Sequence, residues 1–168
     1  HPGLASLTST LLDKGAAGLS ADEIAVRVES LGASLSSASA RDMASVSLRS
    51  LSDSEHLQPA LDLLRDVVGK PDFNRADFDR ERERMLVALR HGEQSPSTVA
   101  EYTFFKTVYG EHPYASRPEG TEASLKALTS ELLDLCDLEV SAVRSHKLIN
   151  RNHTQCPGKY FPEATLIK

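Results

Sequence analysis

The sequence has few residues of several types, and each scarcity excludes a class of protein. It has no Trp, and aromatic residues make up only 5% of its 168 positions, which argues against a platform that stacks nucleic-acid bases. Its two cysteines, Cys136 and Cys156, are too few for a disulfide-rich scaffold. No apolar run approaches the roughly 20 residues that a membrane span needs, so we expect no membrane span.

Positive charge is not in excess either. The chain has 19 Lys and Arg against 24 Asp and Glu, for a net charge of −5. Proteins that bind phosphate backbones usually carry a basic patch, so we expect no nucleic-acid partner. Hydrophobic residues at 40% and charged residues at 26% are typical of a globular chain. The chain begins at His1 without a Met or a signal peptide, which indicates a processed product or a fragment.

The first fifty residues show clear secondary-structure signals. Leucines at helical spacing predict a helix that ends at Gly15. Ser20, followed three residues later by Glu23, predicts a capping box at the start of a second helix, which ends at Gly32. Apolar and polar residues then alternate over 44–49, which predicts the second strand of a pair that turns near Arg41 and Asp42.

The remaining periodic segments predict helices. Asp53 or Ser54 can cap a helix whose buried stripe is Leu57, Leu61, Leu64 and Val68. Further helices are predicted over 75–91, 99–109, 122–128 and 131–138. The Leu and Phe stripes of these helices are expected to face the core.

Two strands against five or six helices predict an α+β fold, with helices packed on one face of an antiparallel sheet. A two-stranded ribbon is only marginally stable by itself. We therefore expect the sheet to have more strands, and the simplest place for them is upstream of His1.

Three stretches resemble the insulinase-like zinc peptidases, the M16 family that includes pitrilysin and the processing peptidases. They are Gly3-Leu4-Ala5 through Lys14-Gly15-Ala16, Phe78-Asp79-Arg80 through Pro96, and Tyr109-Gly110-Glu111-His112-Pro113-Tyr114 followed by Pro118-Glu119-Gly120-Thr121. They follow the family's order. The resemblance implies an M16-like domain over residues 1–135 that lacks its first strands.

In active members of that family, the first helix carries the motif His-x-x-Glu-His. The two histidines bind zinc, and the Glu is the general base for a bound water. The resemblance places those residues at Ser6, Ser9 and Thr10, and places the third ligand, a Glu, at Ala88. Glu81 would then be a supporting carboxylate. Because a neutral hydroxyl is a poor zinc ligand and no carboxylate is present, we expect this domain not to hydrolyse peptides by itself.

The family also implies a role for such a domain. Its enzymes combine related domains around a chamber, and often only one of them holds zinc. The resemblance therefore implies a non-catalytic unit that pairs as a heterodimer with a catalytic M16 subunit and contacts extended peptide substrates. Related bacterial proteins are commonly exported, which implies the bacterial periplasm.

The C-terminal residues, 136–168, resemble a different family. His146 and the Cys156-Pro157-Gly158 segment are similar to the end of zinc-dependent N-acetylmuramoyl-L-alanine amidases, in which the corresponding His and Cys bind zinc. The alternative function is therefore an amidase that acts on peptidoglycan, with zinc at His146 and Cys156. His153 could complete a cluster with them.

Plainer interpretations stay open for these residues. His146 and Cys156 can be a surface His and a small buried Cys, and the tail can reflect a fusion or a misjoined sequence. His112 fits a turn residue before Pro113, which is restricted to extended backbone. The chain as a whole can also be a fragment with no activity of its own. The charged run 79–84 fits a solvated helix face in which residues four apart carry like charges.

Overall fold

The computed structural model describes residues 1–128. The chain divides into two units, His1–Cys136 and Asp137–Lys168, and the described residues belong to the first. The helix predicted over 131–138 lies outside these residues. The domain boundary predicted at residue 135 stays a prediction.

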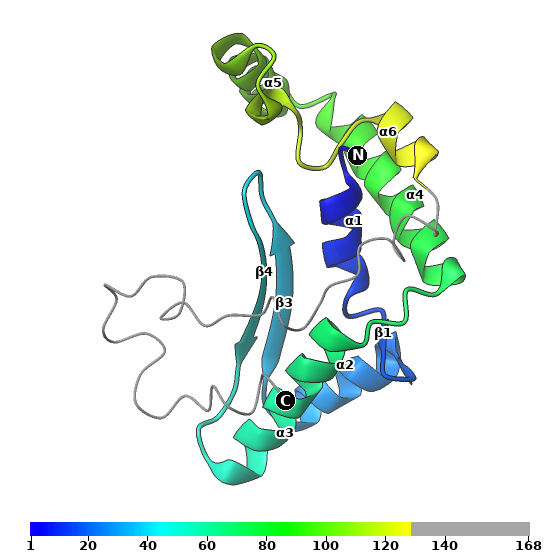
Figure 1. Cartoon of the computed structure of the whole chain (residues 1–168), viewed down its shortest axis with the longest axis vertical. Coiled ribbons are helices and arrows are strands. Elements are labelled where there is room, and N and C mark those ends of the chain that lie inside the picture. The colour runs from blue at the N-terminus through cyan, green and yellow to red at the C-terminus, as the bar shows by residue number, and fades with distance from the viewer. Residues whose placement is uncertain (129–168) are drawn as a thin grey trace. The chain divides into compact units, whose positions relative to one another are not determined.

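Helices dominate the described part of the chain, and short antiparallel strands accompany them (Figure 1). The helices are α1 (Leu4–Leu11), α2 (Ala21–Ser30), α3 (Ser54–Gly69), α4 (Arg75–Gly92), α5 (Pro96–Tyr109), the 3-10 turn η1 (Pro113–Ala115) and α6 (Glu122–Ala127). The strands are β1 (Gly15–Ala16), β2 (Leu19–Ser20), β3 (Ser34–Ser39) and β4 (Ala44–Arg49). This arrangement confirms the α+β fold.

Local side chains begin the helices as the sequence predicts. Ser20 accepts a hydrogen bond from the Glu23 backbone N–H, and the Glu23 carboxylate accepts one from the Ser20 N–H, so the capping box is confirmed. Asp53 caps α3 by accepting from the His56 N–H. Asn74 caps α4 in the same way. These bonds satisfy N–H groups that a helix start leaves without partners.

The predicted strand pair is an antiparallel hairpin, β3–β4, in which Ser37 lies opposite Val46. Its half-buried residues alternate, so that Leu35, Val46 and Leu48 share one face. The strands expected upstream of His1 stay a prediction. A second hairpin, β1–β2, was not predicted; its two turn residues, Ala17 and Gly18, both have positive φ, which favours a tight hairpin turn.

Helix α1 joins two hydrophobic clusters. It lies between the β3–β4 hairpin and α4 (Figure 1). The first cluster connects α1, α4 and α6 and consists of Leu7, Leu11, Phe78, Leu86, Leu89, Leu125 and Leu128. The second lies toward α2 and α3 and consists of Leu12, Ala16, Ile24, Leu63 and Val67. Both faces of this short helix are therefore covered.

Two predictions about buried faces are wrong in part, although Leu61 of the stripe predicted for α3 is buried. On α3 the fully buried residues include Leu63 and Val67, whereas their neighbours Leu64 and Val68 are only partly buried. Helix α5 has no buried residue, and Phe104 is 59% exposed. The reason is that α5 packs mainly against η1 rather than against the two clusters.

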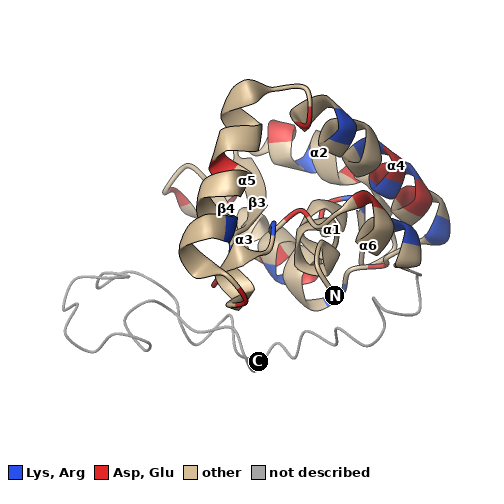
Figure 2. Cartoon of the chain, turned by 90° about the horizontal axis from the view of Figure 1, so that it is seen from above, with Lys and Arg blue, Asp and Glu red and all other residues tan. Residues whose placement is uncertain are grey.

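The solvated helix face predicted for the charged run 79–84 on α4 is confirmed for Arg80, Glu83 and Arg84, whereas Glu81 is buried. Acidic and basic residues alternate along the helix (Figure 2). Asp79 pairs with Arg75 and with Arg82 at 2.9 and 3.0 Å, so opposite charges three and four residues apart offset the like-charge neighbours.

Candidate functional site

Of the three residues predicted at the metal site on α1, Ser6 and Thr10 have hydroxyl groups that donate hydrogen bonds to backbone carbonyls. The Ser6 hydroxyl donates to the carbonyl oxygen of Pro118 at 2.9 Å, although 112 residues separate the two. The Thr10 hydroxyl donates to the Ser6 carbonyl at 2.9 Å. Ser6 thus bonds to the loop before α6, and Thr10 bonds to the backbone of its own helix.

Ser9 is the residue predicted at the position of the family's general base. Its side chain is buried at 6% exposure. Its backbone carbonyl accepts a hydrogen bond of 2.7 Å from the Ser37 hydroxyl on β3. This side of α1 is therefore fastened to the hairpin, and a neutral hydroxyl there cannot act as a carboxylate base near neutral pH.

Ala88, the predicted position of the third ligand, lies on the exposed side of α4. Two helical turns earlier, Glu81 is only 3% exposed. Its carboxylate pairs with Arg84 at 3.2 Å and with Arg80 at 3.5 Å. A carboxylate is thus present where the resemblance predicts one beside the metal site, and two arginines of its own helix pair with it.

These residues do not fit the catalytic zinc of the family. Zinc in such sites takes imidazole, thiolate or carboxylate donors, and a catalytic site needs three of them. Ser6, Ser9 and Thr10 offer only neutral hydroxyls, two of which already donate to backbone carbonyls, and Ala88 offers no donor atom. No step of peptide hydrolysis can therefore be assigned to this helix pair.

Comparison with known families agrees with the fold. A model of the insulinase family, peptidase family M16, matches residues 1–122. The chain belongs to the M16 peptidase family. The match includes both α1 and α4, which carry the four positions discussed above.

Solved structures support this placement. A crystal structure of an M16 inactive domain from Pseudomonas fluorescens has a TM-score of 0.77 and 38% identity over 80% of this chain. A protease from Helicobacter pylori has a TM-score of 0.74 at 22% identity over 81% of the chain, and the periplasmic protease PqqL from Escherichia coli has 0.70 at 15% identity over 80%. At these low identities, the likeness to the Helicobacter and Escherichia proteins shows only that the fold is shared.

The M16-like chain is shorter than these relatives. It covers 32% of the Pseudomonas and Helicobacter chains and 16% of PqqL. The activities and assemblies of the longer proteins are therefore not properties established for this chain.

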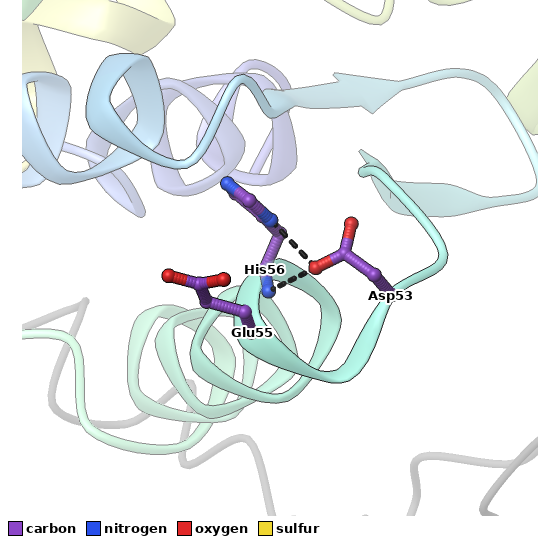
Figure 3. A group of neighbouring side chains, drawn as sticks. All are labelled: Asp53, Glu55 and His56. Atoms are coloured by element: carbon purple, nitrogen blue, oxygen red, sulfur yellow. Dashed lines mark hydrogen bonds and ion pairs between the residues drawn. The ribbon is translucent and has the colours of Figure 1, made fainter.

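One side-chain group in the M16 domain was missed by the sequence analysis. Asp53, Glu55 and His56 lie at the start of α3, and their potential ligand atoms are within 4.8 Å of one another (Figure 3). The His56 ring nitrogen Nδ1 lies 2.6 Å from an Asp53 carboxylate oxygen. This group could have been predicted from a helix-cap residue, Asp53, that is followed three positions later by a His. The same contacts are explained by helix capping, so we assign no metal to this group.

The Asp53–His56 contact changes the protonation of both residues. The hydrogen bond to the carboxylate raises the pKa of His56 above its ordinary value, and the same bond lowers the pKa of Asp53. Both side chains face solvent, so this pair marks a helix terminus rather than a buried reactive centre.

The other predicted residues fall in two groups. His112 is confirmed as a turn residue: it begins η1, and its Nδ1 accepts from the Tyr114 N–H at 3.2 Å. His146, His153 and Cys156 lie outside the described residues, so the zinc site predicted there stays a prediction. The M16 match ends at residue 122, and the comparisons give the amidase interpretation no support.

Proposed function

We propose that this chain is a non-catalytic M16 domain that pairs with a catalytic, zinc-bearing M16 subunit. The observation that carries the proposal is the chemistry of the former ligand positions, where Ser6 and Thr10 donate to backbone carbonyls and Ala88 has no donor. The likeness to an inactive M16 domain at 38% identity supports it.

The role proposed for the domain is to form part of the wall of a peptide-binding chamber. The β3–β4 hairpin is compatible with this role: within residues 1–128 its two strands pair only with each other, so one edge can take the further strands expected in the sheet and the other an extended peptide. Unpaired strand edges offer N–H and C=O groups to an extended peptide.

Among the described residues no helix is long and apolar enough to cross a bilayer.

The pairing is tested by mixing the full chain with an M16 subunit that retains His-x-x-Glu-His. Size-exclusion chromatography with light scattering should show a one-to-one complex, and the complex should cleave a quenched fluorescent peptide faster than the catalytic subunit does alone. Absence of a complex at about 10 μM of each chain, a concentration at which a micromolar partner would bind, contradicts the pairing.

The absence of catalysis is tested separately. The chain alone should leave the same peptide intact, with and without added zinc. A matched variant of the catalytic subunit, with Ser, Ser and Thr in place of His, Glu and His, should lose its cleavage. Zinc-dependent cleavage by the chain alone contradicts the proposal.

We place this function in the bacterial periplasm as part of the same proposal. The support is that one structural relative is a periplasmic protease, at 15% identity. Fractionation of the producing cell, followed by detection of the chain, tests the location. Recovery with cytosolic markers contradicts it.

A further inference from the structure

Helix α5 has few means of attachment to the rest of the described chain. None of its 14 residues is buried. Val99, Phe104 and Val108 are 44%, 59% and 56% exposed. An element that buries so little apolar surface belongs to the low-stability end of a protein.

Two arginines from other segments stack on aromatic rings of α5. The guanidinium carbon of Arg41, in the β3–β4 turn, lies 3.5 Å from the centre of the Phe105 ring. That of Arg117, in the loop before α6, lies 3.8 Å from the centre of the Tyr102 ring. Since the two rings are three residues apart on a helix, both arginines hold the same side of α5.

The β3–β4 turn also holds η1, through Tyr114. Arg41 Nε donates to the Tyr114 carbonyl at 3.1 Å, and the Tyr114 hydroxyl donates to the Asp42 carboxylate at 2.5 Å. Two adjacent turn residues thus bind the backbone and the ring end of one tyrosine. The turn points toward the α5–η1 segment (Figure 1).

Aromatic contacts join α5 and η1 into one body. The Phe105 and Tyr109 rings are stacked with centroids 5.8 Å apart. The Tyr109 and Tyr114 rings meet edge to face at 5.4 Å. A displacement of α5 therefore carries η1 with it.

From these contacts we infer that α5 and η1, residues 96–115, form a strap that opens as one unit when the β3–β4 turn and Arg117 release it, and that the turn makes the larger share of its attachments. The contacts that fasten the strap at Arg41 and Asp42 are surface stacking and hydrogen bonds, whereas α1 and α4 share a buried apolar cluster. Opening therefore leaves the α1–α4 core folded. It frees the hairpin turn and uncovers the Phe105 ring, on which Arg41 stacks.

Hydrogen–deuterium exchange of the full chain tests this strap. Arg41→Ala removes the stacking on Phe105 and the bond to Tyr114, so amides in 96–115 should exchange roughly tenfold faster while those in α1 and α4 keep their rates. Arg49→Ala is the matched control, because Arg49 is an exposed arginine of the same hairpin at the end away from the turn. It should leave both regions unchanged.

A milder variant keeps the test valid if Arg41→Ala disturbs folding. Tyr114→Phe removes only the bond to Asp42 and should speed exchange in 96–115 by a few-fold. Unchanged exchange in 96–115 for both variants overturns the inference. Equal acceleration in 96–115 and in α1 and α4 also overturns it, because the segment would then open only with the whole domain.

Discussion

At the residue scale, the start of α3 shows how one pair of side chains sets a local protonation state. Asp53 accepts from the His56 backbone N–H and lies 2.6 Å from the His56 ring. This contact raises the pKa of His56. Its stabilising effect is fully present below the ordinary His pKa of about 6.5 and is lost as pH rises through the higher folded pKa.

At low pH the Asp53–His56 pair also loses its stabilising effect, because the Asp53 carboxylate becomes protonated. Because the pKa of Asp53 is lowered, the contribution of the carboxylate is present above its ordinary pKa of about 3.9 and is lost as pH falls through the lower folded value. Asp53→Asn should bring the pKa of His56 down toward about 6.5, as followed by NMR titration of the ring protons. An unchanged titration midpoint would show that the contact does not form in solution.

Gly3 presents a second prediction at this scale. Its φ is 89°, and an added Cβ would lie 2.8 Å from the Glu119 carbonyl oxygen and 2.7 Å from a Leu125 methyl carbon. Gly3→Ala should therefore cost about 1 kcal/mol of unfolding free energy for the left-handed backbone and about 2 kcal/mol more for the clash. Urea denaturation measures the total loss of unfolding free energy.

Gly18 provides the control for that substitution. Its φ is 79°, and nothing lies within 4 Å of the added Cβ. Gly18→Ala should cost only the backbone part, about 1 kcal/mol. Equal losses of unfolding free energy in the two variants would mean that the close packing of Gly3 against the loop does not add to the cost of the Gly3→Ala substitution.

At the scale of elements, the contact between α1 and α4 holds α1 in place, the helix on which the family's zinc motif was predicted. Leu86 on α4 is 2% exposed and packs with Leu7 and Leu11 of α1. Leu86→Ala should lower the free energy of unfolding by about 2–5 kcal/mol because it leaves a cavity. Val87→Ala, at a neighbouring side chain that is 59% exposed, should change it by less than about 0.5 kcal/mol. Similar effects of the two would contradict this packing.

Helix α6 is tied to α4 by charge. The Glu122 carboxylate accepts from Arg90 at 2.8 Å and from Lys126 at 2.6 Å, and these bonds lower the pKa of Glu122 to about 2. The resulting stabilisation is present above the ordinary Glu pKa of about 4.3 and is lost as pH falls toward about 2.

Glu122→Gln should lower the thermal midpoint at pH 7, and its difference from the unsubstituted chain should shrink steadily between pH 5 and pH 2. Scanning calorimetry across this range measures the difference. Glu29→Gln, at an exposed glutamate of α2, is the control and should show little effect at either end. A pH-independent difference for Glu122→Gln would show that the ion pair does not stabilise the fold.

Elements with local signals were predictable from the sequence, and those that depend on distant contacts were not. The Ser20 capping box and the β3–β4 hairpin follow from residues a few positions apart. Periodicity could not decide between Leu63 and Leu64, because adjacent apolar residues both lie near the buried face of α3. The exposure of Phe104 depends on what α5 packs against, which its own sequence does not encode.

At the scale of the whole molecule, the helices that carry the candidate site were predictable from the sequence, and its hydrogen bonds were not. Ser6, Ser9 and Thr10 lie on α1 and Ala88 lies on α4, the two helices expected from periodicity, and their assignment to the family's metal site stays a prediction. The bond from Ser6 to Pro118 joins residues 112 positions apart, and no local pattern indicates it. Such long-range partners come from packing, which brings the N-terminal helix against the loop before α6.

We expect the M16 domain to hold no catalytic zinc. The zinc content of the purified full chain, measured by elemental mass spectrometry, tests this expectation, with Cys156→Ser measured alongside to remove any metal held by the tail. The Cys156→Ser chain should contain no zinc above background, because Ser6, Ser9, Thr10 and Ala88 supply no adequate ligands. About one zinc per chain that persists in Cys156→Ser would contradict it.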